Sequence, residues 1–173
     1  MKLKTIRYNK EYQLIDNSTE VARIIKRKWY LSEIESYLKN RTILIKKGNF
    51  WGTSYKIIEM GNSIGRIEWS FKNGYILSLK NSNNKTIKYE LKKVNTRSWN
   101  TLQKQYILQE SDNLVKPILT ININYKLTFK LKSYENIEII FSDDSQIDYL
   151  KSVTAIFLMR KQMSLESSSI YHQ

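Results

Sequence analysis

Along most of the chain, apolar and polar residues alternate at every second position. The segment 125–132 shows this clearly, with Tyr, Leu, Phe and Leu at one set of alternate positions and Lys, Thr, Lys and Lys at the other. Because successive side chains of a β-strand point to opposite faces, a period of two predicts a strand with one buried and one solvated face. Runs of this kind between turn-forming residues predict about twelve strands, near residues 2–8, 11–16, 20–28, 42–47, 51–59, 63–71, 74–80, 85–94, 104–110, 114–123, 125–132 and 136–141.

One early segment, residues 29–41, departs from this alternation. Ser32 and Glu35 stand three residues apart, as they do in the capping box at the N-terminus of a helix. The apolar residues Ile34, Tyr37 and Leu38 would then share one helical face. We therefore predict a short helix in this segment.

Three segments share a pattern of strand, turn and strand. Residues 12–24, 55–67 and, more loosely, 106–118 each place a Tyr nine positions before a β-branched residue, with an acidic residue at the fifth position. Polar turn-forming residues lie between the two halves of each segment. Internal repetition indicates a repeated structural unit, so we predict three similar hairpins.

The C-terminal region has a different pattern. From Ser142 to Met163, acidic residues gather at the start and basic residues at the end, the arrangement that the helix dipole favours. We expect Ser142 or Asp143 to be the N-cap. Residues 152–159 carry no charge, and a helix that is apolar on every side is buried on every side. We therefore predict one domain over residues 1–163, closed by a buried helix, and a polar, frayed tail over residues 164–173.

About twelve antiparallel strands followed by one buried helix favour a closed barrel, with a β-sandwich as the alternative. A barrel of that size leaves an interior too wide for strand side chains alone, and a helix would fill it. The helix 147–163 and the phrase Tyr-Lys-Ile-Ile-Glu (55–59) followed by Ile-Gly-Arg-Ile (64–67) resemble the tubby C-terminal-like superfamily, in its LURP-one-related and phospholipid scramblase-like branch. The resemblance implies a mainly β fold, an antiparallel β-barrel of about twelve strands with the C-terminal hydrophobic helix buried through its centre. It leaves the activity open.

The residue types needed for catalysis or metal binding are scarce. The chain of 173 residues has no Cys, which excludes disulfides, thiolate catalysis and Cys-based metal sites. Its one His, His172, stands beside the C-terminus, and the adjacent Asp143 and Asp144 are better explained by the start of a helix. The sequence contains no Gly-rich phosphate loop, nucleophile elbow or HExxH-type zinc motif. We therefore predict a non-enzymatic protein with no catalytic, cofactor-binding or metal-binding residues.

No part of the sequence predicts a targeting or membrane-spanning segment. The basic residues near the N-terminus are followed by no apolar run, so no signal peptide is expected. No run of about eighteen apolar residues is present. We expect a cytoplasmic protein that is not transmembrane.

The net charge of +13 is the strongest bulk signal for function. A charge of this size attracts anionic partners, although mutational bias alone could also produce it. The densest cluster of basic and aromatic residues supplies the candidate anion-binding residues Arg23, Lys26, Arg27, Lys28 and Trp29. The pairs Lys46–Lys47 and Lys92–Lys93 and the row Lys126, Lys130 and Lys132 would extend this surface if the fold brings them together.

Two classes of partner fit this basic surface. By the resemblance, the expected partner is an anionic phospholipid headgroup or a protein near a membrane, attracted by Lys and Arg and contacted by an aromatic side chain. Nucleic acid is the alternative, with Trp and Tyr side chains as stacking platforms on the same surface.

Overall fold

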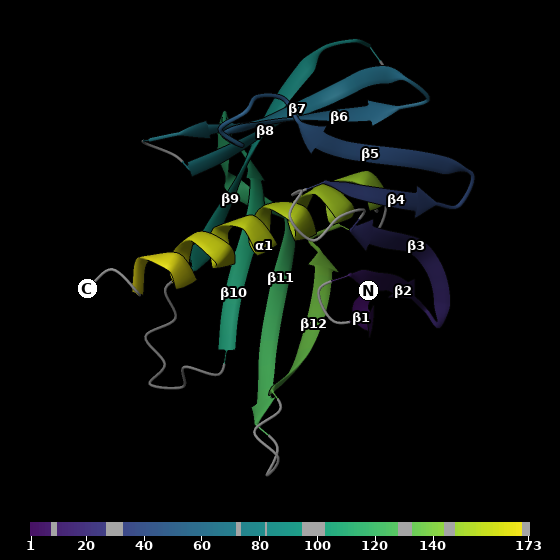
Figure 1. Cartoon of the computed structure of the whole chain (residues 1–173), viewed down its shortest axis with the longest axis vertical. Coiled ribbons are helices and arrows are strands. Elements are labelled where there is room, and N and C mark those ends of the chain that lie inside the picture. The colour runs from purple at the N-terminus through teal and green to yellow at the C-terminus, as the bar shows by residue number, and fades with distance from the viewer. Residues whose placement is uncertain are drawn as a thin grey trace.

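The computed structural model describes residues 1–7, 10–26, 33–71, 74–81, 83–94, 103–127, 133–143 and 148–170. In this part of the chain there are twelve strands and one helix (Figure 1): β1 (Lys2–Arg7), β2 (Glu11–Asp16), β3 (Thr19–Lys26), β4 (Ile34–Leu38), β5 (Arg41–Lys47), β6 (Ser54–Glu59), β7 (Asn62–Ser70), β8 (Gly74–Lys80), β9 (Thr86–Val94), β10 (Gln103–Glu110), β11 (Asn113–Leu127), β12 (Ser133–Phe141) and α1 (Tyr149–Ile170).

The strands form one closed antiparallel barrel. Each strand pairs with its neighbours in the chain, and β1 pairs with β12 to close the sheet, with Lys2 opposite Glu138 and Leu3 opposite Ile137. Closure removes the unpaired edges that would otherwise template aggregation. The predicted closed barrel is confirmed, and the sandwich alternative is excluded.

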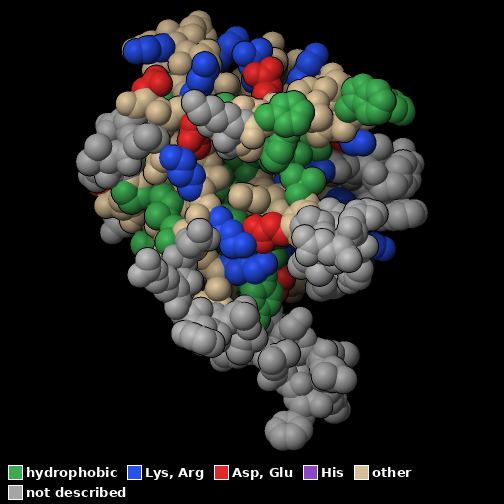
Figure 2. Space-filling model, turned by 90° about the vertical axis from the view of Figure 1, so that its left-hand side faces the viewer, with side chains coloured by type: hydrophobic (Ala, Val, Ile, Leu, Met, Phe, Trp, Pro, Cys, Tyr) green, Lys and Arg blue, Asp and Glu red, His purple; other side chains and the backbone are tan. Residues whose placement is uncertain are grey.

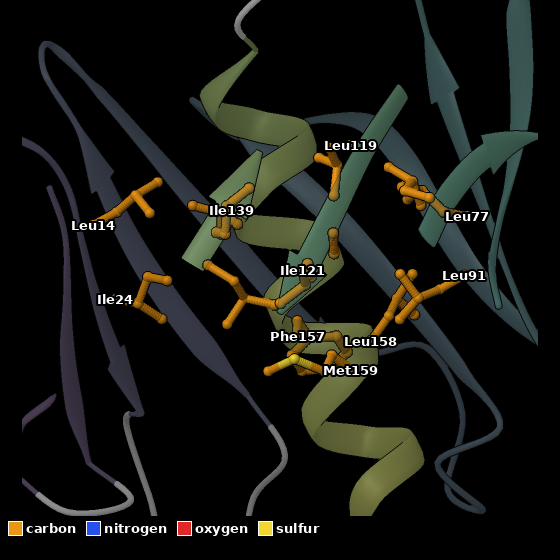
Figure 3. Packing of buried hydrophobic residues seen from close by; sticks show 14 of the residues in the cluster. Leu14, Ile24, Leu77, Leu91, Leu119, Ile121, Ile139, Phe157, Leu158 and Met159 are labelled. Carbon is orange, nitrogen blue, oxygen red and sulfur yellow. The ribbon is translucent and has the colours of Figure 1, made fainter. Parts of the chain in front are cut away.

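The helix α1 lies inside the barrel and supplies the centre of the core. Residues 152–159 are all buried, and Phe157, Leu158 and Met159 lie among side chains that come from strands on both sides of the helix (Figure 3). Every strand contributes at least one inward-facing buried residue, for example Leu14, Ile24, Leu77, Leu91, Leu119, Ile121 and Ile139. An uncharged and mostly apolar helix segment therefore fills an interior that strand side chains alone would leave open, as predicted.

Both ends of the helix differ from the prediction. Asp148 caps the helix, because its Oδ1 accepts hydrogen bonds from the backbone N–H groups of Leu150 (2.9 Å) and Lys151 (3.3 Å). The expected caps, Ser142 and Asp143, were wrong: the Ser142 N–H donates to a β11 carbonyl at 3.0 Å, which extends the strand ladder past β12. At the other end, residues 164–170 of the expected tail are helical.

The short helix predicted in the segment 29–41 was also wrong where the structure describes it; residues 29–32 lie outside the described residues. Residues Ile34–Leu38 form strand β4, which pairs with both β3 and β5. Ile34, Ser36 and Leu38 all point inward and are buried, so the period of two is present but one of its three inward positions carries a polar residue. Hydrogen bonds from two neighbouring strands outweigh the weak local capping signal.

A further correction concerns the segments 114–123 and 125–132, which were predicted as separate strands. They meet in one long strand, β11, whose Asn124 pairs with both Gln103 and Asn136. Residues 128–132 of the second segment lie outside the described residues.

The three repeats form the hairpins β2–β3, β6–β7 and β10–β11, four strands apart around the barrel. Each hairpin has a register shift at the same place, after the inward residue that follows the repeated Tyr: between Leu14 and Ile15, Ile57 and Ile58, and Leu108 and Gln109. These bulges bend the strands and help the sheet to close. The three predicted hairpins are thus confirmed, and they share the position of this first register shift.

The third repeat has a different register from the one that the sequence suggested. Tyr12 and Tyr55 each face the residue twelve positions later, across their hairpins. Tyr106 instead faces Ile121, so the second half of this repeat is displaced by three residues from the expected Ile118. The connection between the strands has the same length as in the other two hairpins, so the difference comes from a second register shift within β11, where Gln109 faces Pro117 and Glu110 faces Asn113.

The two ends of the barrel have different loops. At one end, strands are joined by tight turns in which residues such as Asn17, Lys39, Met60 and Gly61 have positive φ. At the other end the connections are mostly longer, and the C-terminal half of α1 lies there, at the left of Figure 1. We call this second end, where β1, β3, β5, β7, β9 and β11 finish, the exit end.

Candidate anion-binding site

The predicted anion-binding residue Arg23 is already paired with carboxylates. It points outward from β3, where its Nε and NH2 groups donate to the two Glu20 carboxylate oxygens at 2.9 and 3.2 Å. Glu11 lies 3.8 Å away on the neighbouring strand. The hydrogen bond from Arg23 lowers the pKa of Glu20, and the same bond raises the pKa of Arg23. Its positive charge is therefore largely matched within the protein.

Lys26 lies on the opposite face of the same strand. It follows the buried Ala22 and Ile24 at alternate positions, which directs its side chain toward the interior of the barrel at the exit end. Arg27, Lys28 and Trp29 lie outside the described residues, and a role for them stays a prediction. The described part of the predicted cluster, Arg23 and Lys26, is thus not one surface.

The structure instead brings Lys26 together with two lysines from other elements. Lys47 is the last residue of β5 and points inward, because it follows the buried Ile43 and Ile45 at alternate positions. Lys161 extends from α1, with its Nζ 5.0 Å from the centre of the Tyr55 ring and 5.8 Å from that of Phe157. We call Lys26, Lys47 and Lys161 the exit-end lysines.

The exit-end lysines repel one another electrostatically. Burial, together with the positive charges of Lys47 and Lys26, lowers the pKa of Lys161 to about 8. Among the ion pairs that the described residues form, none involves any of the three. The aromatic rings beside Lys161 offset part of the cost, since a ring face attracts a cation.

Other basic residues at the same end have carboxylate partners. Arg160 forms an ion pair with Glu135 of β12, and, although burial opposes its charge, this pair holds its pKa above the usual value. Glu166 lies 2.9 Å from the Nζ of Lys93 and 3.5 Å from that of Lys104. The exit-end lysines differ from these residues, because they point inward and have no carboxylate partner among the described residues.

Exposed aromatic residues stand beside these lysines. Phe50 and Trp51, in the β5–β6 loop, are 88% and 83% exposed, and Phe71, in the β7–β8 loop, is fully exposed. Figure 2 faces the exit end and shows hydrophobic side chains that project from its rim, with basic side chains nearby.

Hydrogen bonds fix the loop that carries Phe50 and Trp51. The Asn49 Oδ1 accepts from the backbone N–H groups of Thr53 (3.1 Å) and Ser54 (3.3 Å). The carbonyl of Thr53 in turn accepts a 2.7 Å hydrogen bond from the N–H of Trp69, which joins the loop to β7. The aromatic side chains therefore project from a loop whose backbone is held in place.

Gly52 brings this loop close to the lysines. Its φ of +69° is one that glycine adopts without strain, and a Cβ at this position would lie 3.5 Å from the Tyr55 hydroxyl oxygen and 3.9 Å from the Lys47 Nζ. The exposed Trp51 and the inward Lys47 are therefore parts of one local surface.

The described residues contain no group of three or more His, Cys, Asp or Glu side chains that could hold a metal ion. Within the same residues, no helix is both long enough and apolar enough to cross a membrane. No protein-family model, curated protein or solved structure matches this chain significantly.

Sequence reasoning did not single out Lys161, and it placed Lys47 only in a surface pair with Lys46. The phase of alternation could have identified Lys47, because it shares the inward set of positions with Ile43 and Ile45. The sequence signal for Lys161 is weaker: it lies one helical turn after Phe157, so the two side chains share one face of the helix.

Proposed function

We propose that this chain is a non-enzymatic β-barrel module that binds anionic phospholipid surfaces through its exit end. The observation that carries the proposal is the combination, at one end of the barrel, of exposed aromatic side chains and lysines that have no carboxylate partner among the described residues. A bilayer that contains anionic lipids offers both complementary features, an apolar layer and negatively charged headgroups.

The two groups of residues would contribute in different ways. Each lysine near an anionic surface adds on the order of 1 kcal/mol of attraction, which salt weakens. Phe50, Trp51 and Phe71 would enter the interface between headgroups and acyl chains, where amphipathic aromatic rings are favoured. Burying apolar area contributes about 25 cal/mol per Å², and this contribution does not decrease as salt is added.

Vesicle co-sedimentation tests the proposal directly. The chain should bind vesicles that contain phosphatidylserine more tightly than vesicles of phosphatidylcholine alone, with a difference that narrows at high salt. Replacing Phe50, Trp51 and Phe71 together by Ser should weaken binding about a thousandfold, if each ring contributes about 1.4 kcal/mol by partial insertion. Because these side chains are exposed, the triple variant should unfold at the same denaturant concentration as the wild type.

Met60→Ser is the matched control, since Met60 is also 88% exposed but lies in a turn at the opposite end of the barrel. It should leave vesicle binding unchanged. Equal binding by the wild type and the triple variant would show that the exit end does not contact the bilayer.

Nucleic acid is the second candidate partner, because exposed aromatic rings beside lysines can also stack unpaired bases. A single-stranded oligonucleotide at matched charge should compete poorly with anionic vesicles if the lipid proposal holds. If the oligonucleotide instead displaces the vesicles strongly, and the triple variant does not bind the oligonucleotide, nucleic acid would be the favoured partner. A chain that binds neither ligand would point to a protein partner at the same surface.

The proposed membership in the tubby C-terminal-like superfamily belongs with this proposal. Its support is architectural, a closed barrel of twelve described strands around a C-terminal helix. A cytoplasmic location is part of the same expectation.

A further inference from the structure

The exit-end lysines have an arrangement that the protein alone does not stabilise. Lys26, Lys47 and Lys161 reach the same place from β3, β5 and α1, and each is half-buried. Gathering like charges out of water costs free energy unless an opposite charge lies among them. Arg160, which lies nearby, has a carboxylate partner in Glu135. The fold therefore provides a carboxylate for one cation at this end, and the three lysines have none among the described residues.

An anion from outside the protein would supply the missing charge. We propose that Lys26, Lys47 and Lys161 together bind one phosphate monoester, carried either by a lipid headgroup such as that of phosphatidic acid or by a soluble phosphate ester. For the lipid source this inference rests on the proposed function and names the headgroup that the exit end prefers.

The charge of the ligand favours a monoester over a diester. A phosphate monoester carries between −1.5 and −2 charges near neutral pH and has three terminal oxygens that accept hydrogen bonds. Each lysine ammonium offers three donors, so three ammoniums can share those oxygens. A phosphodiester, the form found in most phospholipids, has one charge on two free oxygens and substituents on both sides.

The position of the lysines also suits a terminal phosphate. They lie on the inner face of the barrel wall and on the helix, behind the rim that carries Phe50 and Trp51. In this proposal a phosphate at the end of a headgroup reaches the lysines from the rim, while the acyl chains stay level with the aromatic rings.

Two binding assays test the inference and separate the two sources. The first compares vesicles with phosphatidic acid and vesicles with phosphatidylserine at matched surface charge. The second measures binding of glycerol 3-phosphate by calorimetry, with dimethyl phosphate as the diester control. The variants are Lys47→Met and Lys161→Met, which keep the apolar stem, and Lys85→Met, which removes one exposed charge near the opposite end of the barrel.

We expect about tenfold tighter binding to the phosphatidic acid vesicles, and we expect Lys47→Met and Lys161→Met to abolish that preference while Lys85→Met preserves it. Binding of glycerol 3-phosphate but not of dimethyl phosphate, lost in the same two variants, would identify a soluble ester as a sufficient ligand. Preference for the phosphatidic acid vesicles without binding of glycerol 3-phosphate would identify the lipid as the source.

Other outcomes overturn one proposal or the other. Equal binding to the two kinds of vesicle, together with no binding of glycerol 3-phosphate, would overturn the monoester site and leave the membrane function standing. Binding of glycerol 3-phosphate at the lysines by a chain that binds no vesicles would overturn the membrane function and keep the site. A monoester preference that persists in both lysine variants would show that other residues hold the phosphate.

Discussion

Replacing Lys161 by Met should stabilise the barrel at neutral pH. In the wild type this half-buried amine is charged below its pKa and lies near the positive charges of Lys47 and Lys26. Met has a similar length, carries no charge and packs readily against the Tyr55 and Phe157 rings that now contact the lysine. The substitution removes an electrostatic cost and keeps the packing.

The size of the effect follows from the pKa. Burial first, and then Lys47 and Lys26, lower the pKa of Lys161 from 10.5 to about 8. At about 1.4 kcal/mol per pKa unit, the full shift corresponds to about 3 kcal/mol of destabilisation when the amine is protonated. Because the side chain is partly exposed, solvent screens its interactions, and we expect a gain of about 1 to 2 kcal/mol.

The same cost makes the stability of the wild type depend on pH. Below pH 8 the amine is protonated in both states, so the folded state carries the whole cost. Between about pH 8 and pH 10 the folded state releases this proton while the unfolded state keeps it. The free energy of unfolding therefore rises with pH in that window.

Above pH 10 the buried tyrosines reverse this trend. Burial, followed by the nearby Glu110 and Asp148 charges, raises the pKa of Tyr89 to about 12. Tyr106 shifts in the same direction for the same primary reason. An unfolded chain ionises its tyrosines from about pH 10, so the folded state loses stability as the pH rises further.

Urea unfolding followed by circular dichroism at pH 7, 8, 9 and 10 measures both effects. The wild type should become more stable from pH 8 to pH 10, and Lys161→Met should be more stable at pH 7 with no such rise. Lys85→Met is the control, because it removes one exposed lysine and should keep the rise. A Lys161→Met variant that is less stable than the wild type at pH 7, or that keeps the same rise, would refute the reasoning.

Three further substitutions test how the barrel closes on its helix, each by the shift in the midpoint of urea unfolding. Gly65→Ala should cost about 2 kcal/mol, because a Cβ would lie 2.5 Å from the Ser78 carbonyl oxygen on β8; an unshifted midpoint would show that β7 can move away. Phe157→Ala should cost about 3 to 5 kcal/mol through the cavity it leaves around the helix, and a loss below 1 kcal/mol would mean that the barrel collapses onto it. Glu135→Gln should cost about 3 kcal/mol by leaving Arg160 without its carboxylate, and the loss should shrink when Arg160→Met is added.

Alternation alone was enough to predict the class of fold, because each strand of this barrel buries one face. The predicted number of strands matched the structure through two errors that cancelled. The strand Ile34–Leu38 was taken for a helix, and the long strand Asn113–Leu127 overlapped two predicted strands. Neither error changed the architecture, since closure depends on the number of strands and on their pairing.

The site was harder to predict because it depends on how the helix is rotated within the barrel. A helix segment that is apolar on every side specifies burial and gives no direction in which any one face must point. The pairing of Arg160 with Glu135 and the position of Lys161 beside Lys47 both depend on that rotation. Arg23 and Lys26 were taken as neighbours because they are close in sequence, yet they lie on opposite faces of one strand.

The exit end departs from two rules that the rest of the described chain follows. Inward positions elsewhere are mostly apolar, and even at the exit end the cations Arg160, Lys93 and Lys104 have carboxylate partners. At the exit end, three inward lysines gather without such a partner in the described residues, and aromatic side chains face solvent. Neither feature stabilises the folded chain, and natural proteins retain such local conflicts mainly where function requires them. Because both conflicts occur on the same surface, a single anionic and partly apolar ligand accounts for the two together.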